Sequence, residues 1–177
     1  MIVEIFNVIA ISTKMIRANA NIDFKLNHQV HEISGLLQPL SNEFINEKHK
    51  ADKWSIHEII AHLGRYQEIF EERIKLIVVG DGPKFGRYRA DEDGLFTLWV
   101  AKGNEQILED MLNKRVELAM MIRNLSAEDH IKKGTHPVLG TLNIFEWTQF
   151  FLYHETNHIY QIFWLIKEFG GSNSGSV

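Results

Sequence analysis

The sequence predicts an all-α protein, an up-and-down four-helix bundle with a long connection between its second and third helices. Three observations support this prediction: apolar residues repeat at helical spacing in four long stretches, two stretches open with capping motifs, and a glycine-rich segment separates the middle two. A chain of 177 residues fits one domain with a sizeable core. In such a bundle the second and fourth helices run in the same direction and lie diagonally across the core.

The first half of the bundle is predicted from two apolar stripes. The first helix is expected over residues 26–48, and Pro39 should kink or split it because proline cannot continue the backbone ladder. The second helix is expected over residues 54–79. It opens with Ser55 and Glu58, which have the spacing of a capping box. The run Glu71-Glu72-Arg73 further along it is interpreted as an ordinary solvated helix face.

The second half begins with a connection over residues 80–103, which is unusually long for a compact bundle and is typical of a segment that forms part of a site or an interface. The third helix is expected over residues 104–125, and residues 134–140 form a turn-rich loop. The fourth helix opens at Asn143, with Glu146 three residues later as a capping partner.

The expected domain organisation has three parts. Residues 1–23 form an N-terminal arm or an extra helix, residues 24–170 form the bundle, and residues 171–177 form a flexible tail. The apolar start of the chain carries Glu4 where a signal peptide has a basic leader, and it is too short to cross a bilayer. A targeting or membrane role is therefore not expected.

Composition narrows the function classes. The net charge of −4 argues against nucleic acid as a partner, because duplex binding needs a basic face. The absence of cysteine excludes disulfides, cysteine zinc sites and a cysteine nucleophile, and it fits a cytoplasmic protein. The expected partner is a small-molecule substrate or ligand. The apolar segment 95–100 and the helix faces offer candidate surfaces for a homodimer.

Two histidines on the fourth helix are the most informative feature of the sequence. His154 and His158 lie four residues apart on its apolar stripe, so their imidazoles stack one turn apart. Buried imidazoles must be hydrogen-bonded or must bind something. Together with His62 on the second helix they could form an open three-histidine metal site, which leaves a coordination position for water or substrate. Core histidines satisfied by neighbouring polar groups are the alternative, and it stays open here.

The residues His154-Glu-Thr-Asn-His158 also match the zinc-protease motif H-E-x-x-H. That interpretation is disfavoured. The only later glutamate, Glu168, lies on the same helix, and the extended histidine form of the motif is absent. Glu155 lies about 100° from the face of His154 and is interpreted as a solvated or helix-contact residue.

Three segments together resemble the DinB-like (YfiT-like) four-helix-bundle superfamily of metalloenzymes over residues 24–169. They are residues 54–63 (WSIHEIIAHL), 136–142 (HPVLGTL) and 154–162 (HETNHIYQI). The resemblance implies that the metal ligands are His62, His154 and His158 and that the metal is Zn²⁺ or Ni²⁺. Characterised relatives include thiol S-transferases and hydrolase-like enzymes.

The resulting functional expectation is a divalent-metal-dependent enzyme, either a small-molecule thiol S-transferase or a hydrolase. Because the chain has no cysteine, a thiol would have to come from a low-molecular-weight cosubstrate. A non-catalytic metal-binding or ligand-binding bundle is the alternative, with a purely structural bundle third. Tyr66 and His136 are candidate pocket-lining residues. Protonation of the ligand histidines, near their reference pKa of about 6.5, is expected to release the metal.

Overall fold

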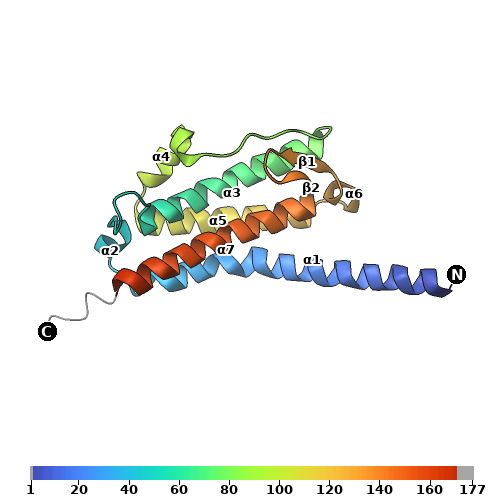
Figure 1. Cartoon of the computed structure of the whole chain (residues 1–177), viewed down its shortest axis with the longest axis horizontal. Coiled ribbons are helices and arrows are strands. Elements are labelled where there is room, and N and C mark those ends of the chain that lie inside the picture. The colour runs from blue at the N-terminus through green and yellow to red at the C-terminus, as the bar shows by residue number, and fades with distance from the viewer. Residues whose placement is uncertain (1, 171–177) are drawn as a thin grey trace.

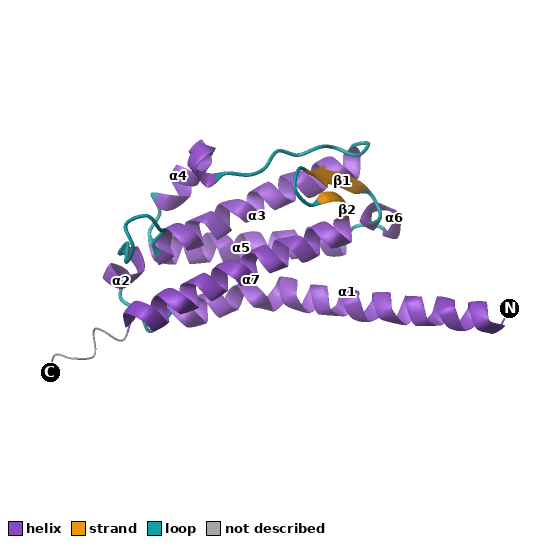
Figure 2. Cartoon of the chain, in the orientation of Figure 1, coloured by secondary structure: helices purple, strands orange, loops and turns teal. Residues whose placement is uncertain are grey.

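The computed structural model describes residues 2–170, with side chains from Ala20 onwards. Four long helices form a bundle, as Figures 1 and 2 show, so the predicted all-α four-helix bundle is confirmed. The long helices are α1 (Ile2–Leu37), α3 (Ile56–Val79), α5 (Asn104–Arg123) and α7 (Ile144–Phe169). The short elements are α2 (Asn42–Asn46), the 3-10 turn η1 (Ala90–Glu92), α4 (Gly94–Val100), α6 (Ala127–His130), and strands β1 (Lys133–His136) and β2 (Gly140–Asn143).

The helix boundaries follow local sequence. The Ser55 side chain accepts from the Glu58 backbone while the Glu58 side chain accepts in return, which completes the predicted capping box of α3. Asn143 and Glu146 do the same for α7. The chain turns near Pro39, which ends α1 and leaves α2 as a separate short helix.

The order of the helices around the bundle differs from the expectation. Both α1 and α3 pack on α5 and on α7, so α3 and α7 are neighbours and not a diagonal pair. They are also antiparallel, because His62 contacts His158 whereas Phe70, later on α3, contacts the earlier Phe151. The predicted parallel, diagonal arrangement is therefore wrong. Its cause is the connection 80–103, which runs back along the bundle so that α5 starts at the same end as α3 (Figure 1).

Residues 2–23 are not a separate element. They continue into residues 24–37 as one helix, α1, whose N-terminal part extends beyond the other helices in Figure 1. The predicted tail, 171–177, lies outside the described residues. Within residues 2–170, none of the helices is both long and apolar enough to cross a membrane.

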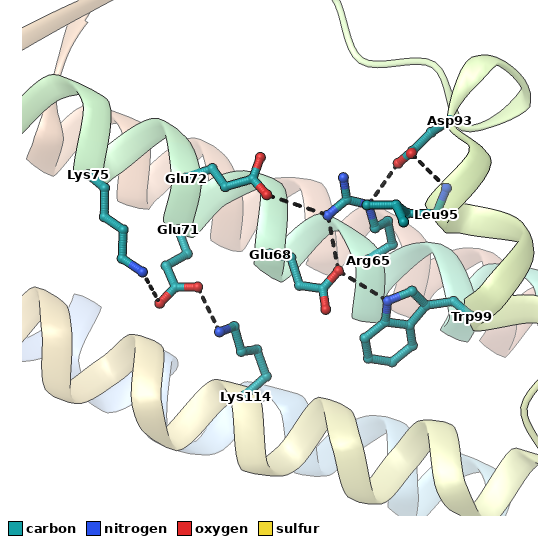
Figure 3. A network of polar contacts seen from close by, with 9 residues as sticks. All are labelled: Arg65, Glu68, Glu71, Glu72, Lys75, Asp93, Leu95, Trp99 and Lys114. Atoms are coloured by element: carbon teal, nitrogen blue, oxygen red, sulfur yellow. Dashed lines mark hydrogen bonds and ion pairs between the residues drawn. The ribbon is translucent and has the colours of Figure 1, made fainter.

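A polar network holds the long connection against α3. The Arg65 guanidinium donates to Asp93, the N-cap residue of α4, at 2.7 Å and to Glu68 at 3.0 Å. The indole N–H of Trp99 donates to the same Glu68 carboxylate, as Figure 3 shows. Phe96 and Trp99 are buried against the bundle, whereas Leu95 and Leu98 are exposed. The segment 95–100 therefore divides between core and surface.

A glycine makes this docking possible. A Cβ atom built at Gly64 would lie only 2.2 Å from Cζ3 of the Trp99 ring. We expect Gly64→Ala to destabilise the protein by about 1–3 kcal/mol, because Trp99 must leave its site or α3 must shift. Urea unfolding followed by tryptophan fluorescence measures this change. Gly35→Ala is the matched control in α1, where an added Cβ meets nothing within 4 Å; equal losses at both positions would contradict the prediction.

The expected turn-rich loop before the fourth helix is a β-hairpin. Strands β1 and β2 pair antiparallel, and Gly140 turns between them at a φ of 78°. The backbone N–H of Phe85 donates to the Thr135 carbonyl at 2.9 Å, which ties the long connection to the hairpin. This contact brings the start of the connection and His136 to the same end of α3 and α7.

The apolar core divides into two clusters along the bundle. One contains Ile59 of α3 and Ile162 of α7, and the other contains Phe70 and Phe151 of the same two helices. The three predicted site histidines fall between these clusters in both helices. Their layer is thus enclosed by packed apolar side chains above and below.

Candidate metal centre

The three predicted ligand histidines converge. The Nε2 atoms of His62 and His154 lie 3.2 Å apart across the α3–α7 interface, and the Nε2 atoms of His158 and His154 are also 3.2 Å apart. One ring nitrogen of each residue lies within 4.8 Å of the other two. Two residues come from α7 because a four-residue spacing places them on one face, and the antiparallel packing of α3 supplies the third.

The imidazoles are held neutral. Burial, and then the positive charge of His158, lower the pKa of His62 to about 3. Burial and then the charges of neighbouring groups, His158 first, lower the pKa of His154 to about 2. Burial thus holds the pKa of both rings below the reference value of about 6.5 that was expected from the sequence. The neutral form, which has the lone pair that a metal needs, persists to lower pH.

The donor set fits a divalent metal. A tetrahedral ion with metal–nitrogen bonds of about 2.0–2.1 Å holds its nitrogens about 3.3–3.4 Å apart, close to the two separations of 3.2 Å. A proton on Nε2 of His154 can point along only one of its two contacts, whereas a cation among the three nitrogens satisfies all of them. Nδ1 of His158 lies 2.8 Å from the Gln161 Oε1, a partner that leaves its Nε2 free as a donor atom.

Aromatic rings surround the histidine layer. The His62 ring lies 4.9 Å from Trp54, 5.7 Å from Tyr88 and 6.4 Å from Phe96, measured between ring centroids. The Tyr66 ring lies 4.1 Å from the His154 ring, tilted by 33°. These rings pack around the histidines and restrict their rotamers.

A cavity of about 360 Å³ opens beside the site, and both predicted pocket residues, Tyr66 and His136, line it. His62 and His154 form part of its wall, so two of the three converging imidazoles face this space. Sequence reasoning missed the other polar residues of the cavity, Arg73, Arg87 and Tyr88. Arg73 was detectable: it continues the spacing of His62, Tyr66 and Phe70 along one face of α3, but its acidic neighbours suggested a solvated surface.

The glutamate of the H-E-x-x-H motif belongs to a different part of the core. Glu155 is 1% exposed, so of its two predicted roles the solvated one is wrong and the helix-contact one is confirmed. Its carboxylate forms a buried ion pair with Arg115 of α5 and accepts from Gln29 of α1 at 2.9 Å. It therefore lies on the faces of α7 that meet α1 and α5 and not among the three histidines. No described carboxylate joins their cluster, which argues against the protease interpretation.

Comparisons with known proteins agree with this architecture. The solved structure of YfiT from Bacillus subtilis matches with a TM-score of 0.70 at 13% identity, over 85% of this chain and 87% of that one. That protein is described as a probable metal-dependent hydrolase with an unusual four-helix bundle topology. The uncharacterized protein YuaE of Bacillus subtilis (strain 168) is 26% identical over 138 residues, which span 71% of this chain and 85% of YuaE. The family model of the DinB superfamily matches residues 25–162, and the chain therefore belongs to the DinB superfamily.

Proposed function

We propose that this protein is a divalent-metal-dependent hydrolase that acts on a small molecule, with His62, His154 and His158 as the metal ligands. The observation that carries the proposal is the convergence of three neutral Nε2 atoms beside a cavity. Three protein ligands leave a coordination position open, whereas a structural zinc site is closed by a fourth. The described residues supply no fourth histidine or carboxylate to this cluster.

Each residue around the site has a separate task. A bound Zn²⁺ or Ni²⁺ would supply Lewis acidity for activating water or polarising a substrate. Gln161 fixes the orientation of His158 through the contact at Nδ1. Tyr66 holds the His154 ring in place by close packing, and its buried position raises the pKa of its hydroxyl, which keeps that group protonated as a hydrogen-bond donor. His136 is a second polar group that lines the same cavity.

Hydrolysis is preferred over thiol transfer for this proposal. The description of YfiT as a probable metal-dependent hydrolase supports the hydrolase class. The chain has no cysteine that could serve as an internal thiol. Thiol transfer would need an external low-molecular-weight thiol, so the two activities can be separated by adding or omitting one.

The test combines metal analysis with activity. Purified protein is analysed for transition metals and then assayed against a panel of ester, amide and phosphoester substrates, before and after chelation. We expect about one ion per chain, hydrolysis by the loaded protein, loss on chelation and recovery with Zn²⁺ or Ni²⁺. A parallel series with added thiol and electrophilic acceptors detects transfer. Hydrolysis that continues at full rate in metal-free protein would overturn the proposal, and activity only with thiol would replace hydrolase by transferase.

A further inference from the structure

The cavity beside the three histidines is positively charged without compensation. Arg73 and Arg87 line it together with His62, His136 and His154, and none of its lining residues is an aspartate or glutamate. A divalent ion on the histidines would add to this charge. Such a space favours a ligand that brings negative charge with it.

Arg73 is the strongest evidence. Three arginines with described side chains are buried: Arg65, Arg73 and Arg115. Arg65 pairs with Asp93 and Arg115 pairs with Glu155. Arg73, only 7% exposed, has no carboxylate partner within the described part of the chain; it donates to the Gly86 carbonyl at 2.9 Å and lies against the Tyr66 hydroxyl. A buried guanidinium normally needs an anion, and this one borders a cavity.

The surroundings of Arg73 hold it in this position. Its guanidinium lies 5.5 Å from the ring centroids of both Phe85 and Trp147, so two aromatic faces support it. The bond to Gly86 fixes it to the long connection next to Arg87. Arg87 is exposed and lines the same cavity, so it can meet a ligand at the entrance while Arg73 meets it inside.

We propose that Arg73 and Arg87 form an oxyanion-binding subsite, so that the substrate carries a carboxylate or a phosphate group. A guanidinium presents parallel N–H donors that match either group. The location of the reacting end at the histidines rests on the proposed function, but the anion subsite itself does not require a metal. Arg73 and Arg87 are then specificity-determining residues, since they select the substrate by its charged end.

The test measures anion binding directly. Inorganic phosphate and, separately, acetate are titrated into the protein while the arginine Nε–H signals are followed by NMR, in metal-loaded and metal-free samples of measured metal content. Arg73→Met keeps the length of the side chain and removes its charge, and we expect it to weaken binding by about tenfold or more. Arg87→Gln, at an exposed position, should weaken binding by about two- to fivefold. Arg89→Gln is the matched control, because Arg89 is exposed on the same connection and pairs with Glu92.

The outcomes separate the two proposals. The subsite is supported if anion binding survives in metal-free protein, falls in the Arg73 and Arg87 variants and is unchanged in Arg89→Gln. The probe that binds more strongly, phosphate or acetate, then identifies the charged group of the substrate. Binding that occurs only with metal and is indifferent to both substitutions would show an anion on the ion itself, and it overturns the subsite. If the purified protein neither contains a metal nor takes one up, but still binds anions through Arg73, the subsite stands and the proposed function is refuted. If Arg73→Met does not fold by circular dichroism, Arg73→Lys and Arg87→Gln decide the question alone.

Discussion

Replacing His154 with alanine should remove nearly all bound metal. Its Nε2 atom lies 3.2 Å from the Nε2 atoms of both His62 and His158, so it is the central donor of the three. We expect the dissociation constant for Zn²⁺ to rise by more than the factor of about 10–100 that is typical of losing an outer-shell partner. Equilibrium dialysis against a competing chelator, with elemental analysis, gives the value.

Two further variants define the scale of this effect. Gln161→Leu removes only the partner of His158 Nδ1, so a smaller rise of about 10–100-fold is expected. His31→Ala, at an exposed position on α1, should leave metal binding unchanged. If His154→Ala retains one ion per chain with the affinity of the wild type, the ligand assignment is wrong.

Breaking the buried ion pair between α5 and α7 should have the largest effect on stability. Arg115 and Glu155 are each 2% exposed as side chains, and Gln67 and Gln29 satisfy their remaining hydrogen-bonding atoms. Arg115→Met leaves the Glu155 carboxylate buried with only a neutral amide as partner. We expect a loss of about 3–5 kcal/mol in the free energy of unfolding at pH 7, measured by urea denaturation of metal-free protein.

The double variant Arg115→Met/Glu155→Leu separates pairing from packing. Because it removes both charges together, it should recover most of the stability lost in the single variant. Arg123, on the same helix as Arg115, forms an exposed pair with Asp23 of α1 in which both side chains are 53% exposed, and Arg123→Met should cost less than about 1 kcal/mol. Equal losses for Arg115→Met and Arg123→Met would mean that burial does not set the strength of these pairs.

Local features of the bundle were predictable because they depend on nearby residues. The capping boxes at Ser55 and Asn143 fixed the starts of α3 and α7, and Pro39 marked the end of α1. The pairing of His154 with His158 followed from the helical repeat alone. Prediction failed where the answer depends on which helix lies opposite, because an apolar stripe does not identify its partner.

The buried charges show the same limit. Arg73 and Arg115 continue an apolar stripe of their helix, and Glu155 lies beside one, yet charged residues in helices are mostly solvated, so the pattern alone favours a solvated position. Their burial depends on partners distant in sequence: Arg115 and Glu155 neutralise each other across two helices. Arg73 has no such partner among the described residues. Of these three buried charges, it is the one that lines the cavity.

Because α1 and α3 lie across the bundle from each other, both helices are synthesised before the helices that cover them. The first two long helices to leave the ribosome share little interface, because each packs on α5 and α7, which are synthesised later. A nascent chain that ends before residue 144 therefore exposes the apolar faces of α1 and α3 that α7 covers. It also holds only one of the three histidines, so the proposed metal site is completed only when α7 packs in the last step of assembly.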